Sequence, residues 1–561
     1  MFNKTFFESD KKSILVLALF CIILYFTNIG GWDLWAPDEP KFGQITREML
    51  QTNDWFIMHI NREPYSDKPP LFFWIAGIFS LIAGNVTALT TRLPSAIAGV
   101  GGVIVAYFIA KKLYNRPIAF LSSIVLATTV KYFWQARWAQ TDMLLCFFIY
   151  LSILCFVNIY KGIGNKTLNA YLVWIFMALA TLSKGPVGII VPLGAIITFL
   201  IVNKEKQKIK ELKIFSGIIL YAVILFVWLA PVLLRAQKST VSDLLWYQNI
   251  TRYINPERHN QPLYYFIERL PLNFMLWFFF LPSALILGFK SKNSPFYTNF
   301  KFNLCWFLFT FIFFSLSPGK REQYIVPMYP ALAMMVGYFF YTYIFEGIKF
   351  DKKLSIPLII FISALVVTAL CMKLIFNKIE DVTETSITII KPIMASLPII
   401  FLAFLILCLL LTKSARTIFY GITSISAVMM LIMIIFLFPA IDSSKSTREL
   451  CSLVDKLRGQ DESIGIYKIF RAEYMFYGNY YLDEIDEVPQ LKDYFNTDKK
   501  KFCIFRESNF QDLMEDNKDL KLYVYYDKKI GSRGIILAGN CPPDTQCLTQ
   551  QHIPEEKIPK K

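Results

Sequence analysis

The chain has 561 residues, of which 55% are hydrophobic and 18% are charged, and its mean hydropathy is +0.44. Soluble domains carry about 25% charged residues, so this composition excludes an ordinary soluble protein. The formal net charge of +16 would suit a nucleic-acid-binding protein. The excess Lys and Arg residues lie in short loops between apolar runs, however, so membrane topology accounts for them and we expect no nucleic-acid partner.

Apolar stretches of membrane-spanning length recur from residue 13 to residue 438, without the alternation of a membrane β-barrel. The sequence therefore predicts an all-α polytopic membrane protein with about thirteen transmembrane helices. The first apolar run has no small-residue cleavage site after it, so we expect an uncleaved span and not a signal peptide. The predicted spans are residues 13–29, 89–110, 117–134, 141–160, 168–183, 186–203, 214–234, 264–289, 301–317, 325–345, 354–376, 391–412 and 416–438.

Residues 70–84, PLFFWIAGIFSLIAG, are apolar but short for a span, and we interpret them as an interfacial or re-entrant helix. If they do not cross, all the short basic loops fall on one side of the membrane, which the positive-inside rule makes cytoplasmic. These loops are residues 111–116, 161–166, 203–213, 290–301, 346–353 and 413–416. The first loop, residues 30–88, then lies on the periplasmic face of a bacterial inner membrane, as does the chain after residue 440.

The chain changes character after residue 440. The runs ESIGIYKIF, KKFCIFRE and LKLYVYY are short and β-like, and NFQDLMEDNKDL is a polar helical stretch. We predict a transmembrane catalytic domain over residues 1–440 and a small periplasmic α/β domain over residues 441–561. Cys541 and Cys547 lie in its tail, and a disulfide between them would be compatible with the oxidising periplasm.

Charged side chains gather beside the predicted spans on the outer face. Charge at a membrane boundary is costly unless it is paired or functional, so this gathering indicates a site. Its carboxylates are Asp38, Glu39, Asp67 and Asp142. Its cations are Lys41, Lys68, Arg137, Lys184, Arg252, Arg258, Lys320 and Arg321, and His259 and Tyr324 accompany them.

These residue types suit the transfer of a group from a lipid phosphate. The departing phosphate needs fixed cations near the membrane boundary, where Lys68 and Lys320 are expected. A carboxylate is needed to orient or deprotonate the acceptor. Aromatic residues suit sugar faces and interfacial seating. The candidates are Trp32, Trp35, Trp55, Tyr65, Trp134 and Trp138.

Structural interpretations compete with the functional ones. Lys41, Arg252 and Arg321 could be interfacial anchors, and Asp142 could cap the N-terminus of a helix. Asp38 and Glu39 could form the first turn of an amphipathic helix over residues 38–52, where acidic side chains complement the helix dipole.

Six motifs, in order, resemble those of bacterial lipid-phosphate-sugar glycosyltransferases of the GT-C fold, over residues 1 to about 440. The nearest branch is that of the aminoarabinose transferases that modify lipid A, within the protein mannosyltransferase-like superfamily. The motifs are PDEPKFGQITREMLQTNDWFIMHINREPYSDKPPL (37–71), RLPSAIAG (92–99), RWAQTDMLLCFF (137–148), LSKGPVGIIVPL (182–193), ERHNQPLYYFI (257–267) and SPGKREQYIVPMYPALAMM (317–335).

The resemblance implies roles for particular residues. Asp38 matches the catalytic carboxylate at the acceptor, with Glu39 in support and Asp142 as a second acidic position. The expected donor-phosphate ligands are Lys68, Tyr65, Lys320, Tyr324, Lys41 and Arg258. The family also allows a divalent metal ion, for which Asp67 and His259 are the matching residues, and it implies no other cofactor.

The first loop departs from the aminoarabinose pattern at four positions. Where that branch has Arg-Tyr and then Glu, this chain has Lys41, Phe42 and Gln44, and Asp67 replaces a Glu. The predicted function is therefore transfer of an aminosugar, either 4-amino-4-deoxy-L-arabinose or a hexosamine, from undecaprenyl phosphate to lipid A. The alternatives are transfer to protein hydroxyls or another glycolipid and, ranked lowest because the charges cluster at one face, transport.

Overall fold

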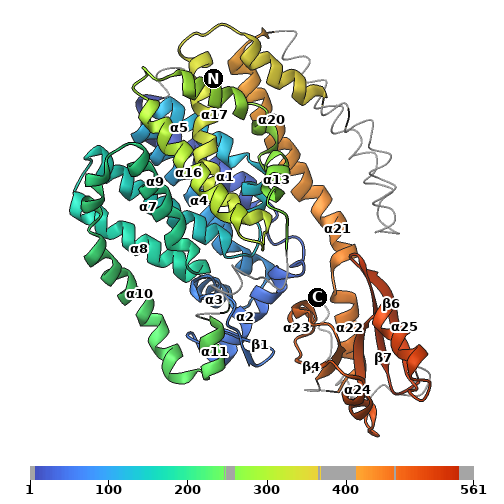
Figure 1. The fold of residues 1–561 in the computed structure, drawn as a ribbon. Coiled ribbons are helices and arrows are strands. Elements are labelled where there is room, and N and C mark those ends of the chain that lie inside the picture. The colour runs from blue at the N-terminus through green and yellow to red at the C-terminus, as the bar shows by residue number, and fades with distance from the viewer. Residues whose placement is uncertain are drawn as a thin grey trace, which may run out of the picture.

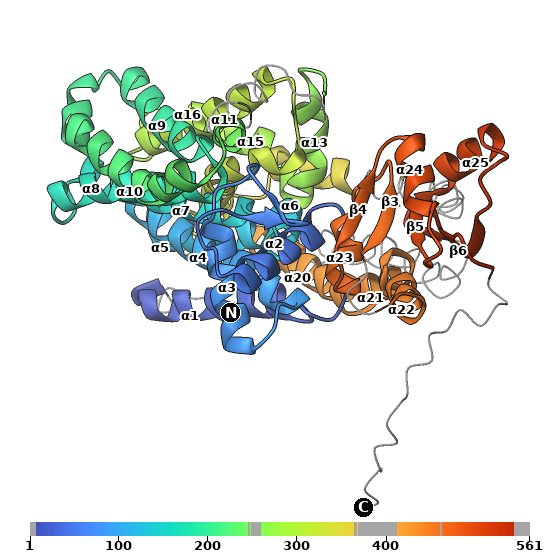
Figure 2. The ribbon, with the colours of Figure 1, turned by 90° about the horizontal axis from the view of Figure 1, so that it is seen from below.

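The structure, a computed structural model, describes residues 7–244, 247, 260–363, 367, 412–459 and 463–542. A large helical part is followed by a smaller part with a sheet, and a long helical segment, orange in Figure 1, connects them. Figure 2 shows the sheet beside the helical part, next to α2 and α3.

The helical part begins with α1 and continues through the first loop, which holds two helices and a two-stranded hairpin. Its elements up to the first gap are α1 (Asp10–Phe26), α2 (Asp38–Thr52), β1 (His59–Ile60), β2 (Glu63–Pro64), α3 (Leu71–Ala83), α4 (Ala88–Leu113), α5 (Arg116–Ala127), α6 (Val130–Ala136), α7 (Asp142–Lys161), α8 (Lys166–Lys184), α9 (Val187–Val202), η2 (Lys206–Leu212), α10 (Ile214–Arg235) and α11 (Lys238–Ser242). After the gap follow α13 (Tyr265–Asn273), α14 (Met275–Phe278), α15 (Leu281–Lys290), α16 (Tyr297–Leu316), η4 (Glu322–Met328), α17 (Tyr329–Ile344), α20 (Ala415–Ile432), the π-helical turn η5 (Met433–Leu437) and α21 (Phe438–Lys445).

Local sequence signals account for several helix boundaries. Thr87 forms a capping box with Thr90 at the start of α4, and the side chains of Asn115 and Asn165 cap α5 and α8. The helix α3 stops at Gly84, whose φ of 79° is a conformation that glycine adopts without strain.

The predicted polytopic helical fold is confirmed. Seven helices among the described residues are long and apolar enough to cross a membrane, or eight if the bent pair α5 and α6 forms one span. The expected number of thirteen is not confirmed: predicted spans 354–376 and 391–412 lie largely outside the described residues, and α9 and α15 are shorter than a full span. The segment 70–84 forms α3, a helix of 13 residues, and its interfacial placement stays a prediction.

The C-terminal part is a five-stranded mixed sheet with helices packed on it. Its elements are α22 (Arg448–Leu457), β3 (Ile464–Tyr467), α23 (Ala472–Gly478), β4 (Leu482–Ile485), α24 (Val488–Phe495), β5 (Phe502–Arg506), α25 (Glu507–Asp516), β6 (Tyr523–Ile530) and β7 (Arg533–Gly539). The strand order is β4-β3-β5-β7-β6, with β3 parallel to β4 and β5 and with β7 antiparallel to β5 and β6. This arrangement confirms the predicted small α/β region. The boundary at residue 440 stays a prediction, because the helical segment runs across it.

The sheet-containing part packs directly on the first loop. Asp33 accepts hydrogen bonds from Arg448 Nε (2.7 Å) and Ser446 Oγ (2.5 Å), and the Tyr477 hydroxyl accepts one from Leu34 N (2.5 Å). At Gly43 a Cβ atom would lie 2.7 Å from the Phe476 ring, so glycine permits the close approach of α23 to α2. The helix α2 is therefore held between the membrane helices and α23 of the sheet-containing part.

Candidate active site

A small pocket on the first loop brings together most of the charged residues that the sequence singled out. It lies where α2, the segment before α3, the start of α7, the end of α8 and the segment around η4 meet. Its lining residues are Asp38, Lys41, Phe42, Tyr65, Asp67, Lys68, Gln140, Thr141, Asp142, Lys184, Arg321, Gln323 and Tyr324.

The helix α2 places Asp38 at the pocket wall. Residues 38–52 form the predicted helix, and Asp38, Lys41 and Phe42 occupy neighbouring positions on one face at a spacing of three and four residues. Asp38 thus does lie in the first turn of α2, as the structural interpretation expected, and its half-buried side chain also lines the pocket.

Three groups surround the carboxylate of Asp38. Arg321 NH2 lies 2.5 Å from Asp38 Oδ2, and Gln140 Nε2 donates to the same oxygen at 2.5 Å. Gln140 is in turn held by Gln135, whose Nε2 donates to Gln140 Oε1 at 2.7 Å. Burial alone would raise the pKa of Asp38, but Arg321, followed by Lys41 and Gln140, outweighs it and holds the pKa below its ordinary value.

Glu39, which the sequence also assigned to the catalytic group, does not line the pocket. Its side chain is fully buried in a bidentate pair with Arg92, with distances of 2.7 Å and 2.8 Å. It also accepts hydrogen bonds from the backbone N–H groups of Trp35 and Ala139. With its oxygens engaged in this way, Glu39 ties α2 to α4 and to the loop before α7.

Asp142 and Lys184 form a second pair in the pocket. Asp142 occupies the first turn of α7, and the Lys184 ammonium, at the end of α8, contacts its Oδ1. The Lys184 Nζ also lies 4.6 Å from the centre of the Tyr324 ring, within the range of a cation–π contact. Lys184, at the start of the KGP sequence 184–186, therefore reaches the pocket.

The third pair comes from the first loop itself. Lys41 Nζ lies 3.1 Å from Asp67 Oδ2 and 4.5 Å from the centre of the Tyr65 ring. Lys68 Nζ donates to the backbone oxygen of Asp67 at 2.8 Å. The two prolines after Lys68 lead into α3, and their restricted backbone limits the positions that Lys68 can take.

The pocket carries more positive than negative charge. Its cations are Lys41, Lys68, Lys184 and Arg321, and its carboxylates are Asp38, Asp67 and Asp142. Each carboxylate pairs with a different cation of the lining, and the cations outnumber the carboxylates by four to three. A monoanionic or dianionic group would be attracted to this pocket.

Some predicted residues lie elsewhere. Lys320, predicted to bind the donor phosphate, is 3% exposed, donates to Gln261 O at 2.9 Å and is not part of the lining. Its neighbour Arg321, which the sequence placed among the outer-face cations but also allowed to be an interfacial anchor, reaches the pocket instead. Adjacent positions in an extended segment point to opposite sides, so sequence alone could not choose between the two. Arg258 and His259 lie outside the described residues.

Four of the five tryptophans predicted to contact a sugar, Trp32, Trp35, Trp134 and Trp138, form a packed cluster instead. Trp35 contacts Trp138 and Phe438 with ring centres 5.8 Å and 5.5 Å apart, and Trp134 stacks on Trp138 at 5.1 Å. Trp35 is only 3% exposed. Tyr65 is the predicted aromatic residue that does line the pocket, together with Phe42 and Tyr324.

The described part of the chain does not offer a metal site. Within it, no three His, Cys, Asp or Glu side chains are grouped so that they could hold an ion. Asp67 has the ammonium groups of Lys41 and Lys68 as neighbours, and cations disfavour a divalent ion there. The donor set around Asp67 therefore does not fit the predicted metal.

Comparison with known sequences finds the same resemblance. The family model for dolichyl-phosphate-mannose-protein mannosyltransferase matches residues 12–245. An undecaprenyl phosphate-α-4-amino-4-deoxy-L-arabinose arabinosyl transferase from Yersinia enterocolitica is 29% identical over 329 residues, 58% of each chain. A second arabinosyl transferase, from Proteus mirabilis, is 27% identical over 335 residues, 59% of each chain. The chain thus matches less than two thirds of the length of these relatives.

Comparison with solved structures extends over nearly the whole chain. The crystal structure of ArnT from Cupriavidus metallidurans bound to undecaprenyl phosphate superposes with a TM-score of 0.79 at 16% identity, covering 94% of this chain and 98% of ArnT. The chain has the GT-C fold. It resembles the aminoarabinose transferase branch of the protein mannosyltransferase-like superfamily. The apo crystal structure of the same ArnT gives a TM-score of 0.77.

The pocket of this GT-C chain is lined by residues that the family model matches and by residues that follow the matched region. Asp38, Lys68, Asp142 and Lys184 lie within the matched residues 12–245. Arg321, Gln323 and Tyr324 lie 76 or more residues beyond that match, in the segment around η4. The contact between Asp38 and Arg321 therefore joins the matched region to the later part of the fold.

Proposed function

We propose that the chain is a glycosyltransferase of the bacterial inner membrane that moves a sugar from undecaprenyl phosphate to lipid A on the periplasmic face. The observation that carries the proposal is the pocket, in which Asp38 stands beside a set of cations that exceeds its carboxylates by one. The activity for which the arabinosyl transferase relatives are named, and the undecaprenyl phosphate bound to ArnT, support this donor. The sugar is an aminosugar, 4-amino-4-deoxy-L-arabinose or a hexosamine.

The cations serve the donor phosphate. In the reaction the bond between the anomeric carbon and the phosphate oxygen breaks, and its electron pair stays on the carrier phosphate. Negative charge on that phosphate grows in the transition state, so a fixed ammonium stabilises the transition state more than the ground state. Lys68 fills this role, because it lines the pocket and the two prolines that follow it restrict its position. Tyr65 and Tyr324 flank the same space and complete the phosphate-binding set with Lys41.

Asp38 serves the acceptor. A new bond forms between the acceptor oxygen and the anomeric carbon. A phosphate acceptor is already anionic near neutral pH, since its second pKa is about 6, and then Asp38 has only to orient it. A hydroxyl acceptor carries a proton that must leave, and Asp38 accepts it. Arg321 and Gln140 fix the carboxylate, while Asp142 and Lys184 form a further ion pair in the lining.

We assign Glu39 and Lys320 supporting roles outside the chemistry. Glu39 holds the start of α2 through Arg92, and Lys320 holds the segment before η4 through Gln261. No step in this mechanism uses a metal ion, because the donors around Asp67 do not fit one.

Protein hydroxyls are a second candidate acceptor. The protein mannosyltransferase family model, which matches residues 12–245, favours it. The two acceptors can be separated in cells: lipid A and periplasmic proteins from strains with and without the gene are analysed by mass spectrometry. A mass increment on lipid A that disappears with the gene supports the proposal. An increment confined to peptides supports the alternative, and no increment on either contradicts both.

A further inference from the structure

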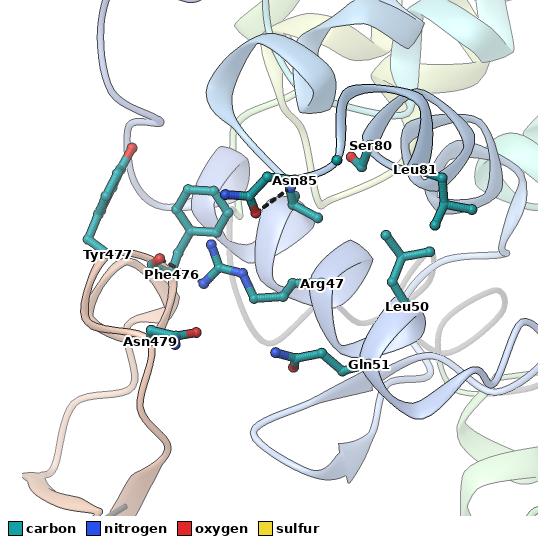
Figure 3. A pocket seen from close by; sticks show the side chains of 11 residues that line it. Arg47, Leu50, Gln51, Ser80, Leu81, Asn85, Phe476, Tyr477 and Asn479 are labelled. Carbon is teal, nitrogen blue, oxygen red and sulfur yellow. Dashed lines mark hydrogen bonds between the residues drawn. The ribbon is translucent and has the colours of Figure 1, made fainter. Parts of the chain in front are cut away.

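A second, larger cleft lies between the first loop and the sheet-containing part. It is bounded by the last turn of α2, the end of α3 and the segment after it, and the end of α23. Figure 3 shows Arg47 near its centre, with Phe476, Tyr477 and Asn479 on one side and Leu50 and Leu81 on the other. The cleft is distinct from the active-site pocket, because Arg47 follows Asp38 by nine residues and so projects from the opposite face of α2.

Arg47 supplies positive charge to this cleft. Its NH1 donates to Phe476 O at 2.8 Å and to Gln44 Oε1 at 3.4 Å, and its guanidinium lies over the Phe476 ring. Among the described residues no carboxylate forms an ion pair with it. The adjacent Glu48 is engaged by Gln44 and by the backbone N–H groups of Asn61 and Arg62. Burial lowers the pKa of Arg47, as expected for a cation without a carboxylate partner.

The same cleft contains partial negative charge. Two of its walls are the C-terminal ends of α2 and α3, at Gln51 and Gly84. The last carbonyl groups of a helix have no partner within the helix and carry about half a negative charge. Asn85 and Asn479, both exposed, add side-chain amides at the rim. The cleft therefore offers the guanidinium of Arg47 and, separately, the carbonyl ends of α2 and α3, which attract cations.

An apolar surface adjoins the cleft. Along α3, Ile78, Leu81 and Ile82 are 50%, 60% and 79% exposed, and Leu81 also lines the cleft. A polar cleft that opens beside such a surface suits an amphiphile whose headgroup enters the cleft while its chains follow the helix.

We propose that this cleft binds the zwitterionic phosphoethanolamine headgroup of a membrane phospholipid. The phosphate contacts Arg47, the ammonium group faces the carbonyl ends of α2 and α3, and the acyl chains lie along Leu81 and Ile82. A lipid in this position contacts both α3 and α23, so it adds to the attachment of the sheet-containing part to the membrane helices.

Binding to the purified full-length chain tests this. The protein is depleted of lipid in detergent and titrated with short-chain phosphatidylethanolamine, or with phosphatidylglycerol of the same chains. We expect phosphatidylethanolamine to bind about tenfold more tightly, because phosphatidylglycerol lacks the ammonium group. Arg47→Gln should weaken both lipids about 10- to 100-fold, the effect of losing one charge-assisted hydrogen bond.

A second variant decides the result if Arg47→Gln fails to fold. Gln51 is exposed, so Gln51→Lys should fold, and it places a cation where the ammonium group is expected. It should weaken phosphatidylethanolamine and leave phosphatidylglycerol unchanged or tighter. Arg62→Gln, which alters a cation–π contact with Tyr481 outside the cleft, should change neither. Equal binding of the two lipids by the wild-type chain, or unchanged phosphatidylethanolamine binding in Gln51→Lys, would overturn the proposal.

Discussion

Asp38 and Arg321 are separated by 283 positions in the chain, yet the carboxylate of one lies 2.5 Å from the guanidinium of the other. Asp38 begins the first-loop helix α2, and Arg321 lies between α16 and η4. The pair thus joins two distant segments at the wall of the active-site pocket. It also sets the charge state of Asp38, since Arg321 is the largest of the contributions that lower its pKa.

Replacing Arg321 with Gln should move the acidic limb of the pH–rate profile to higher pH. Asp38 has a lowered pKa in the folded chain, so its carboxylate stays ionised as the pH falls through the ordinary carboxyl range. Transfer that needs this carboxylate is lost only when the pH falls through the lowered pKa. Arg321 makes the largest contribution that offsets burial, so its removal raises that pKa. Arg269→Gln is the control, because Arg269 lies 3.6 Å from Glu322 and outside the pocket lining. An acidic limb at the same pH in both variants would show that Arg321 does not govern Asp38.

Glu39→Gln should destabilise the protein by about 3–5 kcal/mol, because it leaves the fully buried guanidinium of Arg92 without a charge partner. Thermal unfolding in detergent measures the loss. The comparison is Lys166→Gln, which breaks an exposed pair with Glu211 worth about 1 kcal/mol or less. If the two variants unfold at the same temperature, the buried pair does not stabilise α2 as described.

Asp33→Asn should loosen the sheet-containing part from the first loop. The neutral amide weakens the contacts that Asp33 makes with Arg448 and Ser446. We expect amide hydrogen exchange in α22 to accelerate about five- to tenfold. Lys528→Gln, which breaks the exposed pair with Glu449 on the same helix, is the matched control. Equal protection of α22 in Asp33→Asn and wild type would assign the attachment to other contacts.

Cysteines introduced at Gln207 and Lys518 should label from opposite sides of the membrane. Gln207 lies in a basic loop predicted to be cytoplasmic, and Lys518 lies in the part predicted to be periplasmic. A membrane-impermeant thiol reagent applied to spheroplasts should modify the cysteine at 518 and reach that at 207 only after permeabilisation. Labelling of both before permeabilisation would contradict the topology.

Local patterns were sufficient to predict the helical membrane fold and many of its elements. The α2 helix over 38–52 and the strands β3 and β5 fall within segments expected from periodicity and composition, and β6 overlaps the expected run LKLYVYY and extends beyond it. β4 and β7 were not predicted: two of the four residues of β4 are acidic, which is unusual in strands, and the apolar run of β7 shows no alternation. The disulfide between Cys541 and Cys547 stays a prediction, because Cys547 lies outside the described residues.

The side-chain partners within the site could not be predicted in the same way. Neighbouring side chains point in different directions. Asp38 faces the pocket, whereas Glu39 faces the interior. In the same way Arg321 faces the pocket, whereas Lys320 contacts Gln261. These choices depend on the packing of α4, α7 and η4 around the loop, which no local pattern encodes. The tryptophans illustrate the same limit, because their enrichment near span ends fits a sugar-binding surface and a packed cluster equally well.

The central claim is that Asp38 and Lys68 carry the transfer reaction. It is tested most directly by sugar transfer in proteoliposomes that contain undecaprenyl-phosphate aminosugar and lipid A, with Asp38→Asn and Lys68→Ala compared with wild type. The control is Asp54→Asn, a change in the same loop at a residue that pairs with Arg235 away from the pocket. We predict that each pocket variant folds but loses transfer by about 10²–10³-fold or more, while Asp54→Asn stays near wild type. Transfer near the wild-type rate by Asp38→Asn or by Lys68→Ala would contradict this account of the site.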